Sequence, residues 1–367
     1  MASKGIRIGV VGVNYGAQVQ IPGLISEGYD LVAVCASRQE RADAAAHRFG
    51  ARHAYTSLAE MLKLPGLDAV SIVTPPYLHH NMGIMAMQAG KHVILEKPFA
   101  VNVKEAWDLL SEARKRPQQV AMIGHEFRFA PPRRLVKELI RQGCLGKLNI
   151  GVASLFTAGR PRVPGTPLPA YGPGSDLEKG GGLHKGLGSH YIDCLRDWFG
   201  DINGVVGRLV TNNPERLDPA TGKTVMATAD DAFGLTVTFK NGGWATLTAS
   251  GGTPFGPGAR FELYGTEGAI TTSHPGPNPT VDDPVFAGRL GEKALVRVPV
   301  PAHLQGPPDD RDHRLPSWRV MTQVFADGVK KGISPEPNFL DGFRSQQVMD
   351  GLVESHRTGR FVPIDLS

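Results

Sequence analysis

The first 125 or so residues alternate between short β-branched or apolar runs and segments with a helical pattern. Five runs predict strands (6–11, 31–36, 69–73, 92–95 and 120–123), and three segments between them predict helices (39–49, 78–89 and 103–116). Strands separated by helices pair as βαβ units in a parallel sheet. The run 69–73 is nearly apolar throughout, which is typical of a strand covered on both faces. The sequence therefore predicts an α/β fold with a doubly wound parallel sheet.

A different pattern begins after Pro131. The remaining predicted elements are helices at 135–142, 318–330 and 340–355 and strands at 149–156, 204–211, 233–239, 244–250, 260–264 and 294–298. Asn241 and Gly242 separate two of these strands and predict a hairpin turn, because both residues tolerate positive φ. We therefore expect two domains, 1–125 and 126–367. The second is an α+β domain with a large, mainly antiparallel open sheet.

Whole-chain composition excludes several classes of protein. The chain has 367 residues, of which 41% are hydrophobic, and no run of about 18 apolar residues, so we expect no membrane partner. Its three cysteines (Cys35, Cys144 and Cys194) lie far apart, which favours a reducing, cytoplasmic location over a disulfide framework. The net charge of +5 suits an anionic cofactor. No dense Lys/Arg block interleaved with aromatic residues is present, so we expect no nucleic-acid partner.

The first predicted strand leads into a glycine-rich turn. Its sequence, Gly12-Val13-Asn14-Tyr15-Gly16-Ala17, matches the G-x-G-x-x-G/A pattern at the first and third positions and has Asn14 at the second. Such a turn lets a pyrophosphate approach the backbone at a helix N-terminus in a Rossmann fold. We interpret Gly12, Asn14, Tyr15, Gly16 and Ala17 as cofactor-binding residues. A glycine-rich turn without a ligand remains the alternative.

The end of the second predicted strand indicates which cofactor binds. A carboxylate there would bind the ribose of NAD. Instead Ser37 and Arg38 follow the strand, and Arg41 lies one turn further on. A guanidinium group matches phosphate oxygens, which a carboxylate would repel. We therefore predict NADP. NAD remains the alternative if Arg38 is only a surface residue.

Later motifs identify a family resemblance. The specific strings are Thr74-Pro75-Pro76-Tyr77-Leu78-His79, Ala89-Gly90-Lys91-His92-Val93-Ile94-Leu95-Glu96-Lys97-Pro98, Gly124-His125-Glu126-Phe127-Arg128-Phe129 and Gly180-Gly181-Gly182 followed by Gly188-Ser189-His190-Tyr191-Ile192-Asp193. Together they resemble the glucose–fructose oxidoreductase, inositol dehydrogenase and rhizopine catabolism (Gfo/Idh/MocA) family, over essentially the whole chain.

The resemblance implies roles for individual residues. Lys97 would lie beside the nicotinamide and stabilise alkoxide character on the substrate oxygen, and its peptide bond to Pro98 is often cis in the family. Glu96 would orient the local backbone or the nicotinamide. His190 would transfer the proton, since histidine exchanges protons near neutral pH. Further cofactor contacts are expected from Thr74, Pro75, Pro76 and His79. Asp193, three residues after His190, is orienting or structural.

One position departs from the family pattern. Many family members carry an aspartate four residues before the catalytic histidine, and that position is Gly186 here. Three interpretations stay open. Another group compensates, with Glu126, His184 and Lys185 as candidates; or the vacated space admits a substrate carboxylate or phosphate bound by Lys185, Arg128 and Arg160; or the chain binds cofactor but catalyses weakly, as a sensor or scaffold.

The resemblance implies an NAD(P)-dependent enzyme that transfers a hydride between its cofactor and a sugar, cyclitol or related hydroxylated substrate. Lys97 and His190 are the expected catalytic residues, and no metal ion is expected. Family members commonly form homodimers or homotetramers through the C-terminal sheet, and we expect the same here. A nucleic-acid or protein-binding module built on this fold is a third hypothesis, supported only by the basic charge.

Overall fold

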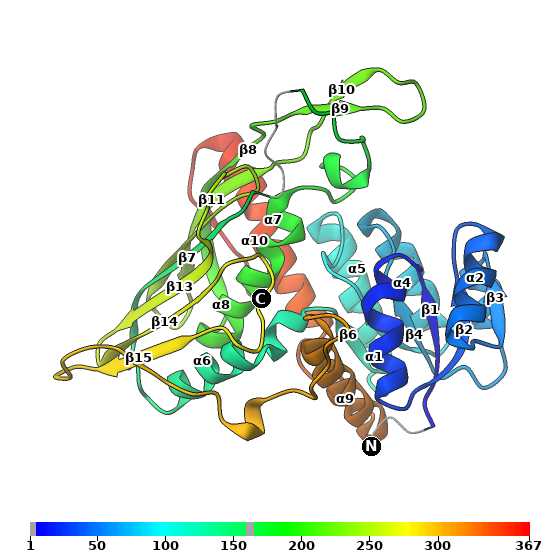
Figure 1. Ribbon diagram of the computed structural model, residues 1–367, viewed down its shortest axis with the longest axis horizontal. Helices are drawn as coiled ribbons and strands as arrows, with labels where there is room; N and C mark the ends of the chain where they lie inside the picture. Colours follow the sequence, from blue (N-terminus) through cyan, green and yellow to red (C-terminus); the bar gives the residue numbers. More distant parts are fainter. Residues whose placement is uncertain (1–4, 159–164) are drawn as a thin grey trace. The chain divides into compact units, whose positions relative to one another are not determined.

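The computed structural model describes residues 5–158 and 165–367 and divides the chain into two compact units (Figure 1). The first unit contains the residues up to Phe129 together with Gly306–Phe343. The second contains Ala130–Gln305 together with Arg344–Ser367. The predicted division into domains 1–125 and 126–367 stays a prediction. No helix of the described residues is long and apolar enough to cross a membrane.

The first unit is built on a six-stranded parallel sheet with the order β3-β2-β1-β4-β5-β6. Its strands are β1 (Arg7–Val11), β2 (Asp30–Cys35), β3 (His53–Tyr55), β4 (Ala69–Ile72), β5 (His92–Leu95) and β6 (Ala121–Ile123). The strand order reverses between β1 and β4, and ligands of doubly wound sheets bind at the carboxyl ends of strands at such a point. The doubly wound prediction is confirmed, and only the short edge strand β3 was not expected.

Helices cover both faces of this sheet. They are η1 (Gly16–Gln20), α1 (Ile21–Ser26), α2 (Gln39–Phe49), α3 (Leu58–Leu62), η2 (Pro76–Leu78), α4 (His79–Gln88), α5 (Val103–Arg114), η3 (Glu126–Phe129) and α9 (Leu315–Lys331). Trp318 of α9 is fully buried, and its indole N–H donates to the Gln20 carbonyl at 3.2 Å. A Cβ built at Gly23 would lie 2.3 Å from the Trp318 ring, so this glycine lets α1 and α9 pack closely (Figure 1).

The second unit is built on a nine-stranded sheet with the order β16-β15-β14-β13-β7-β12-β11-β8-β17. Its strands are β7 (Leu148–Phe156), β8 (Ile202–Val210), β11 (Ala232–Phe239), β12 (Trp244–Ser250), β13 (Gly258–Gly265), β14 (Gly268–His274), β15 (Val285–Arg289), β16 (Val296–Arg297) and β17 (Val362–Pro363). Only β7 and β12 pair in parallel. The hairpin turn between β11 and β12 is confirmed, with Gly242 at a φ of 91°.

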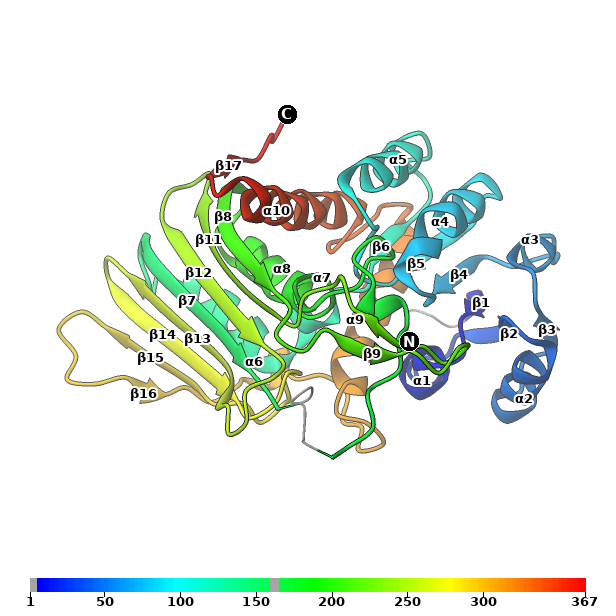
Figure 2. The same ribbon diagram turned by 90° about the horizontal axis from the view of Figure 1, so that it is seen from above.

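The other elements of the second unit are α6 (Pro131–Arg141), η4 (Pro173–Ser175), α7 (Leu183–Gly186), α8 (Gly188–Phe199), η5 (Ala302–Leu304) and the two-stranded ribbon of β9 (Glu215–Leu217) and β10 (Thr224–Met226). Helix α10 (Phe339–Thr358) begins in the first unit and continues in the second. α6 and α8 lie on one face of the sheet (Figure 2), where Tyr191 stacks on Phe261 at 5.3 Å. In the described part of the chain, no helix of this unit covers the opposite face (Figures 1 and 2).

Candidate active site

The glycine-rich turn after β1 has the geometry that a dinucleotide requires. Gly12 has a φ of 101°, and a Cβ built on it would lie 2.3 Å from the Val73 carbonyl oxygen. Only glycine fits this position. A Cβ at Gly16 would lie 3.0 Å from the Val73 side chain, so this other glycine of the turn is also closely packed. The turn leads directly into η1 and α1, whose first N–H groups point toward the turn.

A cavity of about 310 Å³ lies next to this turn, at the carboxyl ends of β1, β2 and β4. Of the predicted cofactor residues it is lined by Gly12, Asn14, Ser37, Thr74 and Pro75, and Arg41 lines it as well. The Arg41 guanidinium donates to the Asn14 side-chain oxygen. None of the described lining residues is a carboxylate. Arg38, by contrast, is exposed and does not line the cavity, and neither do Tyr15, Gly16, Ala17, Pro76 and His79.

His79 has an internal position. Its side chain is fully buried, and its two ring nitrogens lie 2.9 Å from the carbonyl oxygens of Thr74 and Pro98. Burial lowers the pKa of His79 to about 4, so the imidazole is neutral at pH 7. A neutral imidazole has a single ring N–H, so His79 donates to one of these two carbonyls while its ring lies between the loop after β4 and the loop after β5. A direct contact between His79 and the cofactor stays a prediction.

The Glu96-Lys97-Pro98 string follows β5, and the Lys97–Pro98 peptide bond is cis. The Glu96 carboxylate, only 5% exposed, accepts hydrogen bonds from the Gln20 amide at 2.7 Å and from the Lys97 backbone N–H at 3.1 Å. Gln20 in turn accepts from the Ser71 hydroxyl at 2.7 Å. Glu96 thus fixes the backbone of Lys97. Gln20 and Ser71 were not predicted; their only signal is a polar residue at a buried position of a helix and a strand.

A second buried carboxyl group lies in the same unit. Glu126, at the start of η3, is 4% exposed, and the Tyr15 hydroxyl donates to it at 3.3 Å. Burial raises the pKa of Glu96 to about 8; the Glu126 charge adds to this shift and the Lys97 ammonium opposes it. Burial also raises the pKa of Glu126, and the Lys97 ammonium again opposes the shift. Glu96, Glu126, Tyr15 and Lys97 therefore form one electrostatic cluster, the carboxyl cluster.

Arg314 adds a positive charge beside the carboxyl cluster. The Arg314 guanidinium lies 5.0 Å from the centre of the Tyr15 ring. Burial, followed by the charge of Glu126, raises the pKa of Tyr15, so its hydroxyl stays protonated and can donate. Arg128 is buried and donates to Asp341 at 2.8 Å, so the structure gives it an ion pair at the start of α10. Its predicted contact with a substrate stays a prediction.

In the second unit, the glycine-rich segment before α7 is held by Asp230. One oxygen of this buried carboxylate lies 2.5 Å from Nδ1 of His184, and the other accepts the His184 backbone N–H at 3.0 Å. Gly182 has a φ of 114°, and a Cβ on it would lie 2.1 Å from Asp230. Asp230 therefore sets the start of α7. It was not predicted, although the doublet Asp230-Asp231 before an apolar strand was a signal.

The remaining predicted residues of the second unit lie on α7 and α8. Lys185, His190 and Asp193 are all buried, and Asp193 lies about one turn after His190. A Cβ built at Gly186 would meet no neighbouring atom within 4 Å, so open space exists where an aspartate would stand. This space agrees with the interpretation that a ligand group enters there. Arg160 lies outside the described residues. The convergence of Lys97 and His190 on one ligand stays a prediction.

The described residues contain no group of three or more His, Cys, Asp or Glu side chains that could hold a metal ion. The cofactor cavity, by contrast, fits a dinucleotide in three ways. Gly12 supplies the close backbone approach, the adjoining turn opens into a helix, and Ser37 and Arg41 supply polar groups at the end of β2. The first unit therefore has the features of a nucleotide-binding domain.

Comparisons with known proteins agree with this geometry. Residues 6–125 match the oxidoreductase family with an NAD-binding Rossmann fold, and residues 134–271 match the GFO/IDH/MocA C-terminal domain. An uncharacterized oxidoreductase of Synechocystis is 30% identical over 99% of this chain and 97% of its own length. The scyllo-inositol 2-dehydrogenase (NAD(+)) of Bacillus subtilis is 26% identical over 98% of this chain and 97% of its own length.

The fold agrees as well. A solved structure of levoglucosan dehydrogenase in complex with NADH and levoglucosan superimposes with a TM-score of 0.86, at 21% identity, over 99% of this chain and all of the other. The matches of both domain models and the 30% identical relative all point to one family of oxidoreductases. The chain belongs to the Gfo/Idh/MocA family of oxidoreductases, with an NAD-binding Rossmann domain.

Proposed function

We propose that this protein interconverts a secondary alcohol and a ketone on a sugar or cyclitol, with hydride transfer to or from NADP(H). The observation that carries the proposal is the placement of Lys97. Its backbone is fixed by the buried Glu96 carboxylate at the carboxyl end of β5, in the same unit as a turn that only glycine can form. The names of the inositol and levoglucosan dehydrogenases support the substrate class.

The bound nicotinamide supplies the hydride acceptor or donor. Lys97 stabilises negative charge on the substrate oxygen as the carbon–hydrogen bond breaks or forms. The carboxyl cluster is electrostatically coupled to this ammonium, whose charge opposes the rise in the pKa of both carboxyl groups. His190 takes the hydroxyl proton during oxidation and returns it during reduction. Lys185 and the space at Gly186 provide room and a cation for a further polar group of the substrate.

We propose NADP as the preferred cofactor. Ser37 and Arg41 line the cavity at the end of β2, where a 2′-phosphate would lie, and no described carboxylate lines it. We expect Arg38 to contribute less to phosphate binding, because it is exposed and lies outside the cavity. The division into a cofactor domain (1–125) and a substrate domain (126–367) belongs to the same proposal. So does a homodimer or homotetramer, formed through the sheet face that no described helix of the second unit covers (Figure 2).

Lys97→Ala is the direct test. We expect turnover on a panel of sugars, cyclitols and hydroxy acids to fall by about two orders of magnitude or more, because an electrostatic stabiliser of the transition state is lost. Binding of NADPH, followed by its fluorescence, should change little. Lys91→Ala, a lysine before β5 that bonds to the Leu67 carbonyl, is the matched control. Normal turnover by the Lys97 variant would refute the role.

A second candidate function is a cofactor-binding sensor or scaffold. Gly186 favours it, because the aspartate that partners the catalytic histidine in many relatives is missing. The two functions separate in one experiment. A sensor binds NADPH tightly and turns over no member of the substrate panel, whereas the enzyme turns over at least one.

A further inference from the structure

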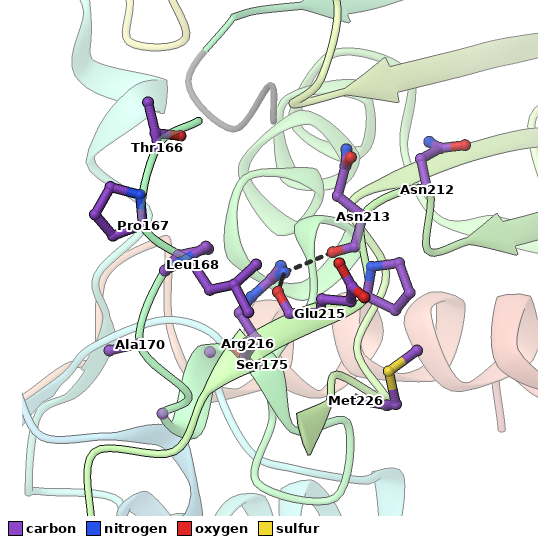
Figure 3. Close-up of a pocket in the computed structure, with 14 residues that line it drawn as sticks. Thr166, Pro167, Leu168, Ala170, Ser175, Asn212, Asn213, Glu215, Arg216 and Met226 are labelled. Atoms are coloured by element: carbon purple, nitrogen blue, oxygen red, sulfur yellow. Dashed lines mark hydrogen bonds between the residues drawn. The ribbon is translucent and has the colours of Figure 1, made fainter. Parts of the chain in front are cut away.

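A second and larger cavity lies wholly within the second unit, beside the β9–β10 ribbon. Its volume is about 670 Å³, against about 310 Å³ for the cavity beside the glycine-rich turn. Ligand sites in proteins typically have volumes of about 300–1,000 Å³. Figure 3 shows Thr166, Leu168 and Ala170 on one side of this ribbon cavity and Asn213, Glu215 and Met226 on the other. None of the proposed catalytic or cofactor residues lines it.

Hydrogen bonds to the backbone hold the walls of the ribbon cavity in place. Leu217 in β9 donates to the Pro169 carbonyl at 2.9 Å and accepts the N–H of Tyr171 at 2.7 Å, which joins the two sides. The buried Asp231 carboxylate accepts the backbone N–H groups of Asn212 and Asn213, each at 2.8 Å. The cavity is therefore formed before a ligand arrives, which lowers the entropy cost of binding.

The chemistry of the lining favours a neutral ligand. Among the described lining residues only Glu215 and Arg216 are charged, and their charges are opposite. The Arg216 guanidinium is buried and donates to the carbonyl oxygens of Asn213 and Glu215, at 2.5 and 2.8 Å, so it stabilises its own wall (Figure 3). Arginine forks that bind phosphate or carboxylate groups instead present their donors to the ligand. Because the two charges of the lining are opposite, the lining favours a neutral ligand over an anion.

The polar and apolar parts of the lining match a sugar ring. The Asn213 amide and the Ser175 and Thr166 hydroxyls can both donate and accept hydrogen bonds, as sugar hydroxyls also do. Leu168 and Met226 supply apolar surface for the C–H groups of a ring. A neutral, polyhydroxylated ring is the ligand class that uses both kinds of surface.

Two lining residues of the ribbon cavity are hydrogen-bonded to the segments that fix the start of α7. The Gly174 carbonyl accepts the N–H of Gly182 at 3.3 Å, directly before α7. The Ser175 carbonyl accepts the N–H groups of Thr228 and Ala229, at 3.0 and 3.2 Å, and the next residue is the Asp230 that holds His184. A ligand in the cavity therefore lies against the loop from which α7 begins.

We propose that the ribbon cavity binds the non-reacting sugar unit of a glycoside or oligosaccharide, while the reacting sugar unit lies at α7. This inference rests on the proposed dehydrogenase function and refines its substrate class. It predicts that disaccharides are better substrates than the monosaccharides from which they are built, because the extra unit gains the contacts of the ribbon cavity.

Met226→Trp tests the proposal, because an indole in place of the exposed Met226 side chain would fill part of the cavity. The control is Val296→Trp, which adds the same ring at an exposed position of β16. The measurement is the ratio of kcat/KM for disaccharides to that for their component monosaccharides. We expect the ratio to fall at least tenfold in Met226→Trp and to stay within twofold in Val296→Trp. An unchanged ratio in Met226→Trp overturns the proposal.

A binding measurement separates this inference from the enzyme activity. The chain has nine methionines, and the ¹³C-methyl resonance of Met226 is assigned by its loss in Met226→Leu. We expect added disaccharide to shift this resonance with or without NADPH. A shift without turnover on any sugar would refute the dehydrogenase function and leave the saccharide site standing. Absence of a shift with every saccharide overturns the site, whatever the activity.

Discussion

Replacing Asp230 by alanine should strongly destabilise the second unit. The carboxylate accepts two hydrogen bonds from His184, at 2.5 and 3.0 Å, and His184 is fully buried. The substitution leaves a buried ring nitrogen and a buried backbone N–H without an acceptor. Each unsatisfied group costs about 1–3 kcal/mol, and more where its lost partner was charged. We expect a loss of about 3–5 kcal/mol in the free energy of unfolding.

Urea unfolding followed by tryptophan fluorescence measures this loss, since Trp198 and Trp244 belong to the second unit. Asp282→Ala is the control; this aspartate is exposed, and its removal should cost less than about 0.5 kcal/mol. NADPH affinity should be unchanged, because the cofactor residues lie in the first unit. A loss under about 1 kcal/mol at an unchanged slope m would show that Asp230 does not hold α7 as described.

Three further predictions concern the first unit. Gly12→Ala should weaken NADPH binding at least tenfold, because a Cβ there would lie 2.3 Å from the Val73 oxygen; equal affinity in a fluorescence titration would contradict the geometry of the turn. Ser37→Asp should lower the ratio of NADP to NAD affinity at least tenfold through repulsion of a 2′-phosphate, and an unchanged ratio would reject the cofactor assignment. Burial raises the pKa of Glu96 from 4.5 to about 8. Between pH 4.5 and 8 the native state therefore binds one more proton than the unfolded state. This contribution to the free energy of unfolding is therefore complete below pH 4.5 and declines by about 1.4 kcal/mol per pH unit as the pH rises toward 8. Urea unfolding at several pH values should show a shallower decline for Glu96→Gln than for the unchanged protein. Parallel curves for the two proteins would argue against a protonated Glu96.

The regular part of the fold could be predicted because local pattern and tertiary environment agree. The predicted bounds of α2, β5 and β12 coincide with those in the structure. The strands β14 and β15 were missed, because glycine, serine and threonine interrupt their apolar alternation. β3 and α3 are too short to give a periodic signal.

The candidate site was predictable only where a motif marks it. Gly12 and Lys97 stand in strings whose chemistry can be read locally, and the structure gives both the expected local geometry. Gln20, Ser71 and Asp230 instead act on residues 46 or more positions away, so no local pattern pairs them with their partners. His79 was predicted to touch the cofactor; its buried position between the carbonyl oxygens of Thr74 and Pro98 depends on how two loops fold together.

The path of the chain limits how this protein can be cut or recombined. It leaves the first unit after Phe129, returns at Gly306 and leaves again after Phe343. A fragment ending near residue 129 would lack α9, and the apolar surface that Trp318 and Phe325 cover would meet water. Such a fragment should aggregate. Chimeras with relatives will therefore preserve the Rossmann core only if residues 306–343 are exchanged together with the N-terminal segment.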